Sequence, residues 1–162
     1  MPLPSTMTPI ATNTLASAAS SVTFSSIPQG YTDLVLVVNS AITTSNDAIY
    51  LQFNSDTGTN YSRTLLYGTG TAAASYRESS VAKIEIGIED TSNSTNIFNI
   101  QNYSNSTTYK TILSRANATT VRVQAGVGLW RSTAAITSVL VGTGTSTFIS
   151  GSTFTLYGIK AA

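Results

Sequence analysis

The chain has 162 residues, which suits one domain, and its eight Lys and Arg against seven Asp and Glu give a formal net charge of +1. It contains no Cys and no His, which excludes disulfide frameworks, thiolate nucleophiles, Cys/His zinc sites and His-based nucleophilic triads. The basic residues are scattered and no run of about 18 apolar residues occurs, so we expect neither nucleic-acid binding nor a membrane span.

The N-terminal segment, residues 1–13, is rich in proline, which fixes φ and removes a backbone donor. It predicts an extended arm, either a disordered end or a hook onto a neighbouring molecule. Residues 14–162 are then a single β-sandwich domain. Its first part, residues 14–24, reads as a strand or bent strand pair that points Val22 and Phe24 inward.

Two apolar segments follow a turn at residues 27–30. Residues 33–39 (DLVLVVN) are short, β-branched and bounded by turn residues, which predicts a strand buried on both faces. Residues 48–54 alternate and place three large side chains inward, namely Ile49, Leu51 and Phe53. A hairpin loop at residues 55–60 leads to a returning strand at 61–67.

Residues 68–78 predict a long loop of small residues, and 81–88 form the clearest amphipathic strand. There Ala82, Ile84, Ile86 and Ile88 face the core, whereas Lys83, Glu85 and Gly87 face outward. Three more strands are expected at 97–103, 109–115 and 121–130. In the last of them one face holds Val121, Val123, Ala125, Val127 and Leu129, and the opposite face holds Arg122, Gln124 and Trp130.

Two C-terminal strands, residues 136–141 and 153–159, carry apolar groups on both faces, and glycines punctuate the segment between them. That pattern suits strands covered on both sides, by a second sheet or by a neighbouring subunit. We expect the last strand to lie inside a sheet. The whole pattern of nine or ten strands predicts an all-β fold, an antiparallel β-sandwich that is jelly-roll-like.

The candidate sites are weak, and we assign no catalytic, cofactor-binding or metal residue. Glu85 and Glu89 share one strand face but lie about 13 Å apart, too far for a glycosidase pair, so they read as solvated charge. The loop residues Asn54, Asp56 and Asn60 offer one carboxylate, which favours turn chemistry over Ca²⁺ binding. Three further charged residues show no constellation: Asp33, Asp47 and Arg131.

Two further patterns, the N-x-[ST] matches and the aromatic residues, have simple explanations. Five N-x-[ST] matches arise by chance and, without a secretory signal, carry no meaning: Asn60, Asn93, Asn102, Asn105 and Asn117. Seven aromatic residues could form a sugar-stacking platform, although core or interface use is favoured: Tyr50, Tyr61, Tyr67, Tyr76, Tyr103, Tyr109 and Trp130.

Charged residues make up only 9% of the chain, so an isolated β-sandwich would lack the usual protection of its edges and faces. We therefore expect a permanent symmetric assembly, with a homotrimer as the natural form for a jelly roll. Its partners would be further copies of itself.

Several segments together resemble a group of small virion structural proteins of tailed bacteriophages. They are IPQGYTDLVL (27–36), LQFNSDTGTNYS (51–62), GLW (128–130), AITS (135–138) and GSTFTLYGI (151–159). The resemblance runs over most of the chain, from about Thr14 to Ile159. It implies a β-rich structural domain on a virion, with other capsid or tail proteins as partners, and transfers no catalytic residue.

Three functions follow as hypotheses. The first is a non-enzymatic virion structural protein, either a head-decoration or cement protein or a neck or tail accessory protein, with a slight preference for the head. The second is a fibre-tip module that binds host surface glycan, motivated by the aromatic and Asn-rich loops. The third is a glycan-cleaving enzyme whose carboxylates come from distant strands, such as Asp33 with Asp56; we expect no enzyme.

Overall fold

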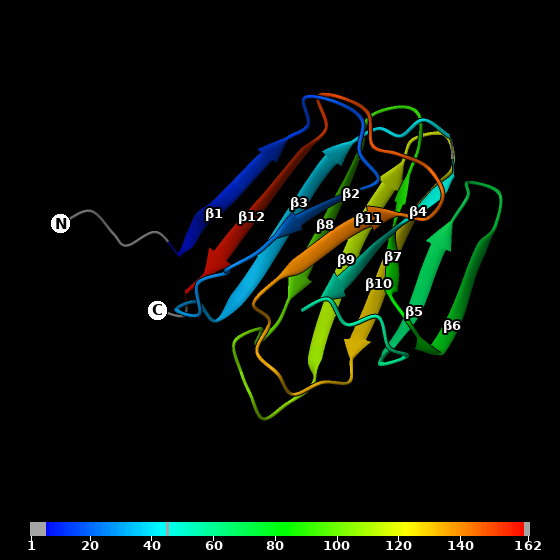
Figure 1. Cartoon of the computed structure of the whole chain (residues 1–162). Helices are drawn as coiled ribbons and strands as arrows, with labels where there is room; N and C mark the ends of the chain where they lie inside the picture. The colour runs from blue at the N-terminus through cyan, green and yellow to red at the C-terminus, as the bar shows by residue number, and fades with distance from the viewer. Residues whose placement is uncertain (1–5, 45, 161–162) are drawn as a thin grey trace.

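The computed structural model describes residues 6–44 and 46–160, and these residues form twelve β-strands and no helix. The strands make two antiparallel sheets that lie face to face (Figure 1). The larger sheet has the order β1-β12-β3-β8-β9-β10-β5-β6, and the smaller one has the order β2-β11-β4-β7. The predicted all-β antiparallel sandwich is therefore confirmed, with twelve strands in the described residues rather than nine or ten.

The strands have the following bounds. The larger sheet consists of β1 (Met7–Thr14), β3 (Asp33–Ser40), β5 (Tyr61–Gly68), β6 (Ala73–Val81), β8 (Ser94–Ile100), β9 (Lys110–Ala118), β10 (Arg122–Trp130) and β12 (Thr153–Ile159). The smaller sheet consists of β2 (Ser21–Phe24), β4 (Asp47–Phe53), β7 (Ile84–Glu89) and β11 (Val139–Thr143).

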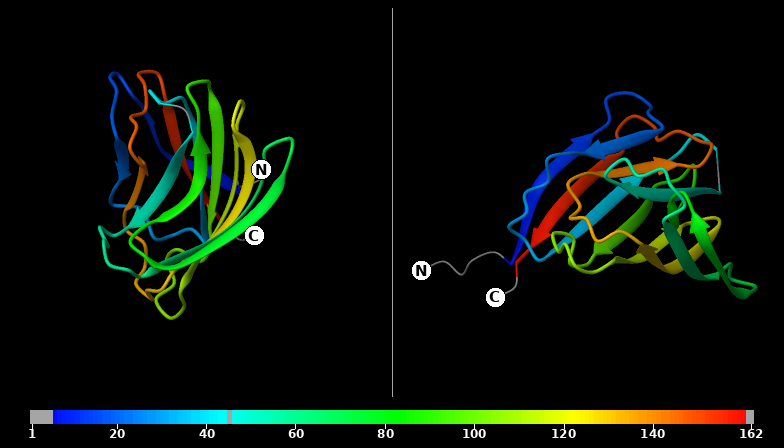
Figure 2. Two further views of the ribbon diagram at one scale, coloured as in Figure 1. Left: turned by 90° about the vertical axis from the view of Figure 1, so that its right-hand side faces the viewer. Right: turned by 60° about the horizontal axis from the view of Figure 1, so that its bottom comes forward.

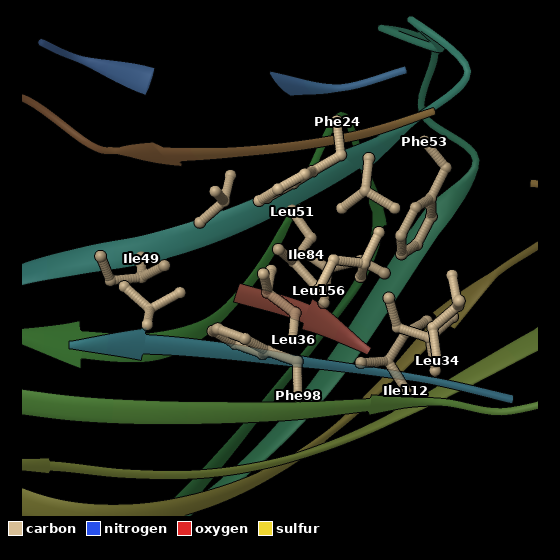
Figure 3. Packing of buried hydrophobic residues seen from close by; sticks show 14 of the residues in the cluster. Phe24, Leu34, Leu36, Ile49, Leu51, Phe53, Ile84, Phe98, Ile112 and Leu156 are labelled. Atoms are coloured by element: carbon tan, nitrogen blue, oxygen red, sulfur yellow. The ribbon is translucent and has the colours of Figure 1, made fainter. Parts of the chain in front are cut away.

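The core lies between the two sheets, where alternate residues of each strand point inward (Figure 3). The predicted inward set of β4 is confirmed, because these three side chains are fully buried: Ile49, Leu51 and Phe53. They pack with side chains of the larger sheet such as Leu36, Phe98 and Leu156. Complete burial of each such side chain stabilises the fold by about 1.5–3 kcal/mol.

The chain passes back and forth between the sheets from β1 to β5, and this corrects the hairpin predicted at residues 55–60. Strand β4 pairs with β11 and β7 in the smaller sheet, whereas β5 pairs with β10 and β6 in the larger one. The loop between them therefore links the two layers. Sequence alternation identified both strands, but it carries no information on which strands pair.

The prediction of a long loop at residues 68–78 is wrong, because most of this segment belongs to strand β6. Strands β5 and β6 form a hairpin, in which Leu66 pairs with Ser75, and its turn contains Gly70 with a φ of 89°. Strand β6 forms one edge of the larger sheet and extends beyond the smaller one (Figure 1). Its residues are exposed apart from the half-buried Glu78 and Val81, so no apolar pattern marks the strand.

The other edge of the larger sheet is β1, which begins within the predicted N-terminal arm. From Met7 onward this segment pairs with β12, so the sheet starts before residue 14, and residues 1–5 lie outside the described part. Pro9 sits in this edge strand, where its missing N–H costs no ladder hydrogen bond and discourages further pairing.

Strand β12 lies between β1 and β3, which confirms that the last strand is interior to a sheet. The expectation that strand β3 is buried on both faces is wrong. Leu34, Leu36 and Val38 are completely buried in the core, while Val35 and Val37 on the opposite side are only half-buried. No strand among residues 6–44 and 46–160 packs over that side.

Candidate functional site

Strand β10 turns its aliphatic side chains away from the core. The predicted separation into two faces is correct, but Gln124 and Trp130 point inward, whereas Val123 and Val127 are 61% and 47% exposed. Glycine explains this orientation: at Gly128 an added Cβ would lie 2.5 Å from Cγ2 of Ile84 on β7. The inner face of β10 can therefore approach the smaller sheet closely only because it has no side chains at Gly126 and Gly128.

The neighbouring strands extend this apolar surface across the larger sheet. In one row Leu113 of β9 lies beside Val127, and in the next row Ala125 lies beside Leu66 of β5. We call the outward-facing set on β8, β9, β10 and β5 the apolar face: Leu66, Ile97, Leu113, Val123, Ala125 and Val127, with Arg115 among them. Leu66 is 62% exposed and Leu113 is 39% exposed.

The apolar face carries positive charge. A shallow depression runs over it past Leu66, Val123, Ala125 and Arg115. Arg115 and Arg77 both project from this side of the sheet, and among the described residues neither guanidinium has an ion-pair partner. The apolar face is therefore the candidate interaction surface that the described residues offer.

The opposite surface of the sandwich has a different character, because its charges are satisfied within the chain. On the smaller sheet Lys83 Nζ lies 2.9 Å from Glu85 Oε1 and 4.3 Å from the ring centroid of Tyr50. Gln52 there donates a hydrogen bond of 2.9 Å to the carbonyl of Ala82. These contacts describe an ordinary solvated surface.

The two glutamates predicted to share a strand face point to different places. A bulge in β7, opposite Ile49 and Tyr50, changes the alternation between them. Glu85 forms ion pairs with Lys83 and Arg63 at the surface, and Arg63 itself is buried. Burial works to raise the pKa of Glu85, but these two cations hold the pKa below its ordinary value.

Glu89 is completely buried and points toward β3 and β8. Its Oε1 accepts hydrogen bonds of 2.6 Å from Ser40 Oγ and 2.8 Å from Asn96 Nδ2. Burial dominates over these hydrogen bonds and raises the pKa of Glu89 to about 7. The expectation that Glu89 is a solvated surface charge is therefore wrong.

The loop at residues 54–60, for which the sequence favours turn chemistry over Ca²⁺ binding, is organised by internal hydrogen bonds, as turn chemistry predicts. Asp56 accepts bonds of 2.7 Å from Trp130 Nε1, 2.9 Å from the Gly58 N–H and 3.0 Å from Asn60 Nδ2. Asn54 Oδ1 accepts from the backbone of Thr137 at 2.8 Å. Within residues 6–44 and 46–160, no group of three or more His, Cys, Asp or Glu side chains is placed to hold a metal ion.

The remaining charged candidates serve separate parts of the fold. Asp33 accepts from the Asn102 N–H at 2.7 Å, and Asp47 accepts from the Ser146 N–H at 2.7 Å. Arg131 donates to the Thr59 carbonyl at 2.8 Å. Asp33 and Asp56 are thus bound to different loops, and the structure does not bring them together as a catalytic pair.

The aromatic residues and the N-x-[ST] asparagines are also dispersed. Tyr61, Tyr103 and Trp130 lie in the core, as the preferred interpretation held, while Tyr76 is exposed on β6 and Tyr109 is exposed in the loop before β9. Several of the asparagines make local structural bonds: Asn60 bonds to Asp56, Asn105 to the Thr107 N–H, and Asn117 to the Thr95 N–H.

Comparison with protein-family models finds no match to this chain, and comparison with curated proteins finds none either. The apolar face is consequently identified from its geometry alone. Sequence reasoning grouped Val123, Ala125 and Val127 correctly but did not place them outward. The two glycines that alternate with them, Gly126 and Gly128, are the signal that marks the inner side of β10.

Proposed function

We propose that the chain is a non-enzymatic structural protein of a tailed-bacteriophage virion that works through symmetric self-assembly and docking to other virion proteins. Within the virion it would be a head-decoration or cement protein, or a neck or tail accessory protein. The observation that carries the proposal is the apolar face, which leaves large side chains such as Leu66 and Val123 about three-fifths exposed in the single chain.

Two further features support an assembly role. Charged residues are few, and most of the carboxylates that the structure describes hold loops and strands together, as Asp47 and Asp56 do. The resemblance of segments such as residues 27–36 and 151–159 to phage virion proteins supplies the setting. A many-copy particle protein needs a rigid scaffold with interaction surfaces, and a two-layer sandwich provides that.

The fibre-tip alternative has less support. A sugar-binding platform needs aromatic rings gathered on one wet surface, and three of the seven candidate rings are core residues: Tyr61, Tyr103 and Trp130. The exposed Tyr76 and Tyr109 lie on different segments of the chain.

The test is to locate the protein on purified particles of the phage that encodes it. Mass spectrometry of gradient-purified virions is expected to find the chain in multiple copies, and antibody-gold labelling is expected to place it on the head or the tail. Absence of the chain from intact, infectious particles would overturn the proposal. Labelling confined to fibre tips, together with binding to host glycan, would instead favour the alternative.

A further inference from the structure

The outer side of the larger sheet is wide enough for a stable protein interface. Eight strands spaced about 4.8 Å apart, each roughly seven residues long at about 3.3 Å per residue, give a surface of roughly 900 Å². A standard stable interface buries about 800 Å² on each partner. The half-buried Val35 and Val37 of β3 continue the apolar face beyond β8, in the direction of the β1 edge of the sheet, so the surface is continuous.

The position of Arg115 restricts how a second copy can cover this surface. Arg115 lies in the middle of the apolar face, next to Ala125 in the register. A two-fold, face-to-face contact centred on the apolar face would bring two Arg115 side chains together with no carboxylate among these strands to neutralise them. A head-to-tail contact, in which the face meets a different surface of the neighbour, avoids that repulsion.

Strand β6 carries an exposed carboxylate, which the apolar face lacks. On the side of β6 that points away from the apolar face, the exposed Tyr76 lies next to Glu78, whose side chain is 40% exposed. Arg63 and Tyr76 both bond to Oε2 of Glu78, and no described residue donates to its Oε1. The carboxylate is therefore able to accept a further charged donor, with an aromatic ring beside it.

The position of β6 in the fold makes it accessible to a neighbour. It is the edge strand of the larger sheet and lies beyond the smaller sheet, as both views in Figure 2 show for the β5–β6 hairpin. Its exposed backbone edge and its nearly continuous exposure leave both of its sides open.

We propose that the apolar face is covered by a second copy of the chain in a head-to-tail contact, with the neighbour's β6 lying over Arg115 and its Glu78 paired with that guanidinium. This inference rests on the proposed function, because it identifies the surfaces through which the symmetric oligomer forms. Head-to-tail contacts close into a ring when the rotation between neighbouring copies divides a full turn, and a trimer is the smallest ring of this kind. Arginine within an apolar, water-excluded surround is a typical centre of binding energy.

The absence of cysteine from the chain gives a direct test of the contact. Ala125→Cys on the apolar face and Ala74→Cys on the far side of β6 are small substitutions at exposed positions. Treating the double variant with a short bismaleimide is expected to give covalent multimers on a denaturing gel, while each single variant stays at one-chain mass. Dimers from Ala125→Cys alone would show a face-to-face contact and overturn the proposal, as would one-chain mass for the double variant.

A second measurement uses a matched pair of charge insertions. Val127→Glu on the apolar face is expected to weaken oligomerisation at least tenfold in mass photometry over a dilution series. Thr23→Glu, at an exposed position on the outer side of the smaller sheet, is expected to leave the oligomer unchanged. Equal behaviour of the two variants, or a wild-type chain that is monomeric at its highest soluble concentration, would overturn the inference.

The proposed function and this inference fail in different ways. If the chain is found in virions but Val127→Glu still assembles like the wild type, the virion role stands and the assigned surface is wrong. If the double cysteine variant forms multimers but the chain is absent from virions, the contact stands and the virion role is wrong.

Discussion

The indole Nε1 of Trp130 donates a 2.7 Å hydrogen bond to Oδ2 of Asp56, which joins the end of β10 to the loop that crosses between the two sheets. The Trp130 ring lies 5.5 Å from that of Phe53 and 6.3 Å from that of Tyr61, measured between centroids. Burial raises the pKa of Tyr61 to about 12, so its hydroxyl stays protonated and donates to the Asp56 carbonyl at 2.9 Å. The loop, the aromatic group and both sheets are therefore tied together at one place.

Replacing Asp56 with alanine is expected to lower the free energy of unfolding by about 1–3 kcal/mol, because the buried indole N–H loses its acceptor. Asp56→Asn keeps an acceptor and should lose less. Urea unfolding at neutral pH measures both, and equal stability of Asp56→Ala and the wild type would contradict the structural role.

The same carboxylate gives an acid-dependent effect. Burial works to raise the pKa of Asp56, but hydrogen bonds from Trp130, Asn60 and Gly58 hold the pKa below its ordinary value of 3.8. The stability it contributes is present above pH 3.8 and is lost as the pH falls through the lower folded-state pKa. Unfolding of Asp56→Asn between pH 2 and 5 is expected to lack this part of the acid sensitivity.

The contribution of Glu89 to stability is expected to change with pH in the direction opposite to that of Asp56. The Glu89 pKa of about 7 in the folded chain lies above the 4.5 of an ordinary Glu, so the folded state holds the proton more tightly than the unfolded state. The contribution of this group to stability is complete below pH 4.5 and declines through pH 7, by about 3 kcal/mol in total. Glu89→Gln should therefore be more stable than the wild type at pH 8.

The control for that prediction is Glu85→Gln. Because the pKa of Glu85 lies below its ordinary value of 4.5, Glu85 is expected to stay ionised in the pH range around 7 where Glu89 titrates, and its replacement should leave the slope of stability against pH unchanged there. Chemical unfolding of the two variants at several pH values makes the comparison. A Glu89→Gln variant with the wild-type slope would show that Glu89 does not titrate in this range.

Gly128 is expected to tolerate no side chain. An added Cβ would lie 2.5 Å from Ile84 Cγ2, so Gly128→Ala must push β10 and β7 apart at a cost of about 1–3 kcal/mol. Gly30→Ala is the control, because a Cβ at Gly30 meets nothing within 4 Å. Thermal unfolding of the two variants should differ clearly, and similar melting temperatures would mean that the two layers are less closely packed at Gly128.

Replacing Arg63 is expected to lower the free energy of unfolding more than replacing Lys83, the other cation that binds Glu85. The Arg63 side chain is only 8% exposed and pairs with both Glu78 and Glu85, so Arg63→Ala leaves a poorly solvated carboxylate and should cost about 2–4 kcal/mol. Lys83 is 34% exposed and pairs with Glu85 alone, so Lys83→Met should cost less than about 1 kcal/mol. Equilibrium unfolding in denaturant at one protein concentration compares them directly.

Sequence patterns predicted individual strands well where large apolar residues alternate with polar ones. Strand β4 was found with its inward residues, and β7 was found with Ile84 and Ile86 inward, because period-two alternation reports directly on which side chains share a face. The interior position of β12 was also predicted, from the apolar groups on both of its sides.

Other parts of the fold could not be read in this way. Strand β6 is exposed on both sides, so its sequence carries no alternation and resembles a loop. Alternation groups the residues of β10 but does not say which group meets the second layer, and the apolar group turned out to face solvent. Arg115 was not singled out, because its place within the apolar face follows from the pairing of β9 with β8 and β10.

The position of β12 between β1 and β3 has a consequence for biosynthesis. Thr12 of β1 and Thr155 of β12 are neighbours in space but 143 residues apart in the chain, so β1 has no pairing partner until β12 has been synthesised. Contacts so distant in sequence make folding slow. On the ribosome, the edges of β1 and β3 that later pair with β12 therefore stay unpaired. We expect the yield of folded protein to depend on chaperones and growth temperature more strongly than the stability of the folded chain would indicate.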